Sequence, residues 1–183
     1  MPKKDLSVSK LILGLFTLFL LLIIQEGVLN RLNISPVNLI LIFLIIVGIL
    51  NSLRFALALG LVGGLMLDFT SPFPDGLIIV CCLIVILLLD FVINKILARE
   101  PSYLIYFGSV LGGTIVFFVS LVIVNKIFII FKINSLLNYD YILFHASWIG
   151  LILNLIFTYP VLRLYLFMEN LNQKLFVNRL KLD

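Results

Sequence analysis

Residues 60–77 read GLVGGLMLDFTSPFPDGL, and they differ from the rest of the chain, which is mostly Leu, Ile, Val and Phe. Small side chains recur at helical spacing at Ala56, Gly60 and Gly64, and Asp68 follows four residues later. Residues four positions apart lie on one face of a helix. We therefore expect a narrow face on which a second helix approaches the backbone closely, and this face ends in a carboxylate.

The composition outside this stretch predicts an all-α integral membrane protein. Hydrophobic residues make up 63% of the chain, and the mean hydropathy is +1.26. Soluble domains are about half apolar, so this chain needs lipid around it. We expect residues 1–183 to form a single membrane domain in the bilayer. No basic stripe interleaved with aromatic residues occurs, which argues against a nucleic-acid partner.

The apolar runs predict six transmembrane helices, because a span needs about 20 apolar residues and at least roughly 17. The expected spans are 11–25, 36–50, 53–68, 76–97, 103–124 and 141–167, with a cytoplasmic tail at 168–183. The second and third spans are short, so we expect a thin or re-entrant hairpin packed against protein. Pro36 suits the first turn of the second helix, with Ser35 or Asn33 as its cap.

Basic residues predict the orientation, since Lys and Arg stay preferentially on the cytoplasmic side. With both termini inside, the inner segments hold ten of the 13 Lys and Arg residues and the outer segments hold three. The turn after Asp68 then faces outward. Residues 125–140 form either an interfacial segment on the outer surface or a lid over an outward-facing pocket.

Ionisable residues inside spans are candidates for function. Asp68 lies at the C-terminal end of its helix, where a carboxylate opposes the helix macrodipole. We therefore expect Asp68 either to have a function or to form a specific hydrogen bond. Asp75 is explained by N-capping of the following helix, which Gly76 and Leu77 open. Asp90 is expected to form a structural ion pair with Lys95.

The remaining polar and small residues favour helix packing over catalysis. Asn154 is expected to bond another helix, and Pro160 to kink or weaken the last span. A second small-residue cluster contains Gly108 and Gly112, which form a close-packing pair. His145, the single histidine, is expected at the membrane interface. No nucleophile elbow, phosphate loop or metal motif occurs, so the sequence predicts no enzyme, cofactor or metal.

The segment Gly60-x-x-x-Gly64-Leu65-x-Leu67-Asp68, followed by a turn that contains Pro72 and by Gly76-Leu77, resembles the signature of the MreD family. These proteins are bacterial rod shape-determining membrane proteins. Six spans, cytoplasmic termini and a proline in the last span are also similar. The specific part of the resemblance covers about residues 60–76, and the polar outer segment at 134–140 departs from it.

The resemblance implies a non-enzymatic scaffold in the inner membrane that maintains cell shape. Its partners would be the bitopic protein MreC and, in a larger peptidoglycan-synthesis complex, MreB, RodA and a transpeptidase. The implied fold is similar to the S component of energy-coupling-factor transporters, with an outward-opening cavity. The alternative is a vitamin-binding subunit of such a transporter. The first helix, however, lacks the small-x-x-x-small alanine pairs that are typical of those proteins.

Overall fold

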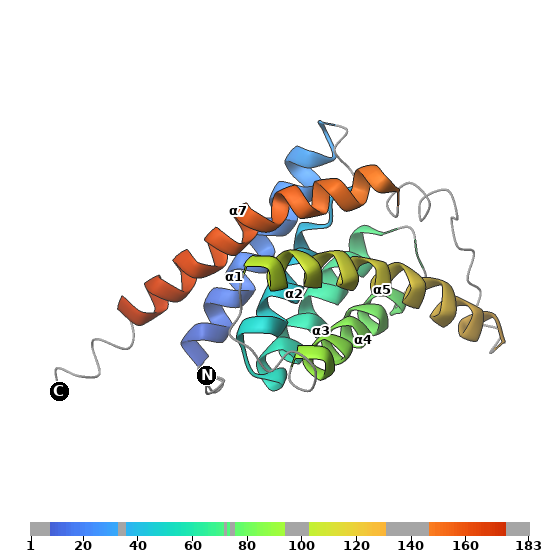
Figure 1. The fold of residues 1–183 in the computed structure, drawn as a ribbon, viewed down its shortest axis with the longest axis horizontal. Coiled ribbons are helices and arrows are strands. Elements are labelled where there is room, and N and C mark those ends of the chain that lie inside the picture. The colour runs from blue at the N-terminus through green and yellow to red at the C-terminus, as the bar shows by residue number, and fades with distance from the viewer. Residues whose placement is uncertain are drawn as a thin grey trace.

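The computed structural model describes residues 8–32, 36–71, 73, 76–93, 103–130 and 147–174. Every regular element in these residues is a helix, so the all-helical prediction is confirmed for them (Figure 1). The elements are α1 (Val8–Ile24), the π-helical turn η1 (Gln25–Leu29), α2 (Leu39–Leu50), α3 (Leu53–Thr70), α4 (Leu77–Val92), α5 (Tyr103–Ile130) and α7 (Trp148–Asn172).

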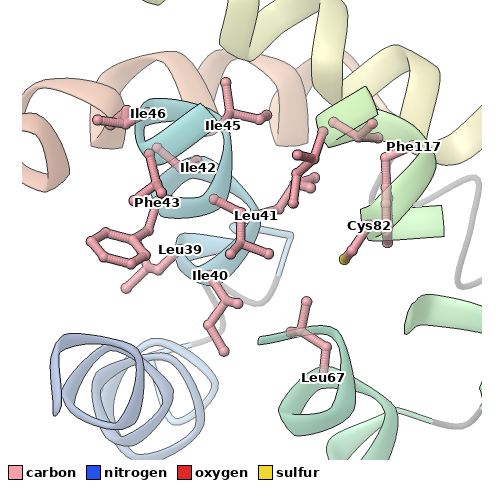
Figure 2. Close-up of a cluster of buried hydrophobic side chains, with 14 of the residues drawn as sticks. Leu39, Ile40, Leu41, Ile42, Phe43, Ile45, Ile46, Leu67, Cys82 and Phe117 are labelled. Carbon is pink, nitrogen blue, oxygen red and sulfur yellow. The ribbon is translucent and has the colours of Figure 1, made fainter. Parts of the chain in front are cut away.

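The core of the bundle is α2, which the other helices surround. Eleven consecutive residues of this helix, from Leu39 to Ile49, are buried. Figure 2 shows side chains of this helix, among them Ile40, Leu41 and Ile45, pointing outward in different directions, with Leu67, Cys82 and Phe117 of other helices around them. A helix that is hydrophobic all round is expected to be buried all round, and α2 behaves in this way.

Four helices, counted with η1 as part of the first, are long and apolar enough to cross a membrane. They are the helices at Val8–Leu29, Leu53–Thr70, Tyr103–Ile130 and Trp148–Asn172. By contrast, α2 has 12 residues and α4 has 16. At 1.5 Å per residue these two helices are about 18 and 24 Å long, shorter than a hydrocarbon core of about 30 Å.

The outer surface of the bundle is apolar, as a chain surrounded by lipid requires. Large hydrophobic side chains are exposed along α1, α5 and α7, including Phe16, Ile123 and Ile156. These side chains are exposed on the surface of the described bundle. The molecule is therefore a multi-pass membrane-embedded protein, and the short helix α2 lies against protein as predicted. The expectation that the third helix is also short is wrong, because α3 has 18 residues and is apolar enough to cross a membrane.

Several helix boundaries differ from the approximate ones expected, and two of these differences are informative. The second helix begins at Leu39 rather than at Pro36, because the side chain of Asn38 caps it by accepting a hydrogen bond from the backbone N–H of Leu41 at 2.9 Å. The proposed caps, Ser35 and Asn33, lie outside the described residues. In addition, no separate segment begins at residue 125, since α5 continues without a break to Ile130. Residues 131–146 lie outside the described residues.

Two ends of the bundle are used as reference points below. The capped end is the end at which α3 finishes and α2 and α4 begin. The opposite end is the end at which α1 begins, α2 meets α3 and α7 finishes (Figure 1).

Candidate functional site

The small-residue face of α3 lies against α4. A methyl group added at Gly64 would meet the Cα atom of Ile79 at 2.8 Å, so backbone contacts backbone at this point. One turn earlier, a methyl group added at Gly60 would overlap the end of the Ile86 side chain. Ala56 lies on the same face and is 1% exposed. Small residues allow this kind of close approach between membrane helices, and they fix α3 and α4 as a tight antiparallel pair.

The carboxylate of Asp68 caps the N-terminus of α4. Its Oδ2 atom accepts the backbone N–H of Gly76 at 2.8 Å, and Oδ1 accepts the N–H of Ile78 at 2.9 Å. Asp68 is 8% exposed, so these are buried, charge-assisted hydrogen bonds. Gly76 has a φ of +86°, a left-handed conformation that glycine adopts without strain, and it turns the chain so that both amides face Asp68.

This cap explains why a carboxylate lies at the C-terminal end of α3. At the C-terminus of its own helix Asp68 would oppose the macrodipole, but in space it lies at the N-terminus of the next helix, where a negative charge is favourable. The first N–H groups of a helix have no partner within it, and Asp68 supplies one. Sequence analysis assigned this cap to Asp75. Asp75 and Pro72 lie outside the described residues.

The buried N-terminus of α2 is capped in a similar way, from other parts of the chain. The N–H of Leu39 donates to Oε1 of Gln25 at 2.9 Å, and the N–H of Asn38 donates to Oδ1 of Asn154 at 3.0 Å. Gln25 and Asn154 are 8% and 2% exposed. The predicted bond from Asn154 to another helix is thus present, and it joins α7 to the start of α2.

A cavity of about 360 Å³ opens between these two capped helices. Its polar lining comes from η1 and from the end of α3, through Gln25, Glu26, Asn30 and Thr70 among others. Its apolar lining comes partly from α5, through Phe117, Phe118 and Leu121, and partly from residues beside the ends of α2, α3 and α4. This volume is within the range of small-molecule sites. The cavity is therefore the candidate binding site, and Asp68 supports it by capping Ile78, one of its lining residues.

The opposite end is fastened by different polar contacts. Asn51, buried in the turn between α2 and α3, donates to the hydroxyl of Tyr165 at 2.8 Å. Nearby, Lys10 of α1 and Glu169 of α7 form an ion pair at 3.5 Å, and the ammonium group lies 5.4 Å from the ring centroid of Phe55. These contacts join the first and last helices at the end away from the cavity.

The small residues of α5 divide into two sets. A methyl group added at Gly113 would meet the end of the Ile45 side chain of α2 at 2.7 Å, so this glycine lies against α2. At Gly108 and Gly112 an added methyl group meets nothing within 4 Å, so the close packing expected of this pair is not found within the described residues. Both residues line an apolar groove between α4 and α5. The helix α7 continues through Pro160, which is exposed.

The described residues contain no group of three or more His, Cys, Asp and Glu side chains that could hold a metal ion. Asp90 is described, but its predicted partner Lys95 is not, and His145 also lies outside the described ranges. The roles of Gln25 and Asn38 were not predicted from the sequence. Asn38 directly precedes a long apolar run, which is an N-cap signal. Gln25 gave no comparable signal, because its partner is a backbone amide 14 residues later.

Comparison of the sequence with protein-family models matched none, and comparisons with curated proteins and with solved structures gave no significant match.

Proposed function

We propose that the chain is a non-enzymatic scaffold of the bacterial cell-wall elongation complex, a member of the MreD type that spans the inner membrane six times. The resemblance rests on residues 60–76, and the geometry of this stretch supports it. Gly60 and Gly64 pack α3 on α4, and Asp68 caps α4, so these three residues have an architectural use.

The proposed partner is a bitopic protein of the MreC type, acting together with MreB, RodA and a transpeptidase. The proposed orientation has both termini in the cytoplasm, so that the capped end and its cavity face outward. The charge distribution of the sequence supports this orientation. A scaffold needs no chemistry of its own, and the arrangement of Asp68 agrees with that role because both of its oxygens are occupied by backbone amides.

The experiment is copurification from native membranes combined with depletion. The tagged chain is extracted in mild detergent, and bound proteins are quantified by mass spectrometry against an unrelated tagged six-span protein. We expect enrichment of one single-span protein with a coiled coil, and rounding of rod-shaped cells when the chain is depleted. Unchanged cell shape together with no enriched single-span protein would overturn the proposal.

The cavity favours a second candidate, a small-molecule-binding subunit of a transporter. An S component would hold its ligand in an outward-opening cavity, and the 360 Å³ cavity at the capped end has a suitable size. Against this candidate, α1 has no alanine, and Gly14 meets Leu59 of α3 rather than an open surface. Native mass spectrometry that detects a stoichiometric vitamin on the purified chain would favour the transporter subunit over the scaffold.

A further inference from the structure

The cavity at the capped end has an uneven electrostatic lining. Glu26 is the single charged residue among its described lining residues. The polar neighbours are Gln25, Asn30, Asn38, Thr70 and Ser71. Arg31 follows on the same turn but is exposed and does not line the cavity. Among the lining residues that the structure describes, a ligand therefore meets one negative charge and no positive one.

Anions are disfavoured here even though two helices begin at the cavity. Helix N-termini attract anions through their free N–H groups. At α2, however, the amides of Asn38 and Leu39 already donate to side chains. At α4, the amides of Gly76 and Ile78 donate to Asp68. These donors are occupied, and an anion would also meet the carboxylate of Glu26.

The Glu26 carboxylate is oriented and retains acceptor capacity. Its Oε2 atom accepts Nδ2 of Asn30 at 2.6 Å, and Oε1 accepts Nε2 of Gln25 at 3.4 Å. An ionised carboxylate offers about four lone-pair sites, so about two remain. All three residues belong to η1 or directly follow it, and π-helical turns occur frequently at functional sites. The wide turn thus holds one carboxylate beside the cavity.

Aromatic rings also line the cavity. Phe117 and Phe118 pack edge to face, with ring centroids 5.5 Å apart and an angle of 75° between the planes. Phe73, 7% exposed, adds a third ring to the lining. Ring faces attract organic cations, and they also pack against apolar bodies. A carboxylate and aromatic rings that line one cavity suit a molecule with an ammonium group and an apolar part.

We propose that this cavity binds a small organic ammonium ion, with the ammonium group at Glu26 and the apolar part against Phe117 and Phe118. The ion is either a free amine or the amine headgroup of a phospholipid, since both present the same group. This site is independent of the scaffold role and goes beyond it. A cavity of about 360 Å³ accommodates either form.

The test uses the full chain in nanodiscs of phosphatidylglycerol, which has no ammonium group. The probes are 2-phenylethylammonium and 3-phenylpropanoate, which share an aromatic body and differ in charge. Binding is measured by saturation-transfer NMR and by the shift in unfolding temperature. We expect the ammonium probe to bind at least tenfold more tightly than the carboxylate. Equal binding of the two probes, or no binding of the ammonium probe at millimolar concentration, would overturn the proposal.

Two variants locate the site. Glu26→Gln keeps the shape and removes the charge, so it is expected to weaken the ammonium probe about tenfold, the size of one charged hydrogen bond. Glu169→Gln removes the same charge at the opposite end and is expected to leave affinity unchanged. Phe118→Leu is expected to weaken binding of the ammonium probe while the variant stays folded. If Glu26→Gln and Glu169→Gln bind equally well, the ammonium group does not lie at Glu26 and the proposal fails.

The same nanodiscs distinguish the two sources of the ion. When phosphatidylethanolamine is added, a headgroup ligand displaces 2-phenylethylammonium in proportion to the lipid. A free-amine site is not affected by the lipid, and the probe stays bound. Either result keeps the ammonium site and identifies its occupant. Cell-shape complementation by Glu26→Gln is measured separately, so failure of the ligand site does not count against the scaffold.

Discussion

Removing the Asp68 carboxylate tests how the α3–α4 pair is held. In Asp68→Ala the N–H groups of Gly76 and Ile78 lose their side-chain acceptor. A hydrogen bond to a charged group contributes about 1.5–3 kcal/mol, and a buried donor left without a partner costs a similar amount. Two such bonds place the loss at roughly 3–6 kcal/mol, above the roughly 0.5–2 kcal/mol of an ordinary exposed N-cap. In Asp68→Asn one acceptor oxygen remains, so about half of this loss is expected.

The measurement is equilibrium unfolding of the purified protein in mixed micelles, with increasing amounts of a denaturing detergent. We expect the order of stability wild type, Asp68→Asn, Asp68→Ala. Thr70→Ala is the matched control from the same last turn, because its hydroxyl donates only to carbonyl groups of its own helix, Met66 and Leu67. If Asp68→Ala unfolds at the same detergent fraction as Thr70→Ala, the carboxylate does not stabilise α4 and the capping argument is wrong.

Three further predictions concern helix contacts and use the same unfolding assay. Gly64→Leu should prevent stable folding, because its side chain would overlap backbone, whereas Gly112→Leu should fold normally, because an added Cβ meets nothing there. Equal expression and stability of these two variants would contradict the packing assignment. Asn154→Leu leaves the Asn38 amide at the start of α2 without its partner and should lower the free energy of unfolding by about 1–3 kcal/mol. A loss below about 0.5 kcal/mol would refute this hydrogen bond. Tyr165→Phe removes one hydroxyl from Asn51 and should cost about 1 kcal/mol, whereas no loss at all would show that this contact is dispensable.

Sequence periodicity was sufficient for the local features of this fold. The Ala56, Gly60 and Gly64 spacing predicted a close helix contact, since a stripe of small residues has few other uses in a membrane helix. The apolar runs predicted where helices occur, and the shortness of α2 predicted that it packs against protein. These features depend on residues that are close in the sequence, so they can be predicted from one sequence alone.

Features that depend on distant residues could not be predicted in the same way. The cap that Asp68 supplies to α4 is one such feature, because the tight turn at Gly76 brings the preceding helix end back over the new N-terminus. Gln25 and Asn154 each accept a backbone amide at the start of α2. They belong to separate helices, so no sequence spacing relates them. The cavity arises from the same convergence, so its lining was not foreseen.

The buried position of α2 has a consequence for how the protein is made. This helix leaves the ribosome second, but Asn154, the partner of its Asn38 amide, lies 116 residues further along the chain. Until α7 arrives, the amide of Asn38 at the N-terminus of α2 lacks its final partner. We therefore expect the second hydrophobic segment to reach its final packing only after the last one has been inserted. The folding of this protein is then expected to end with the docking of its final helix.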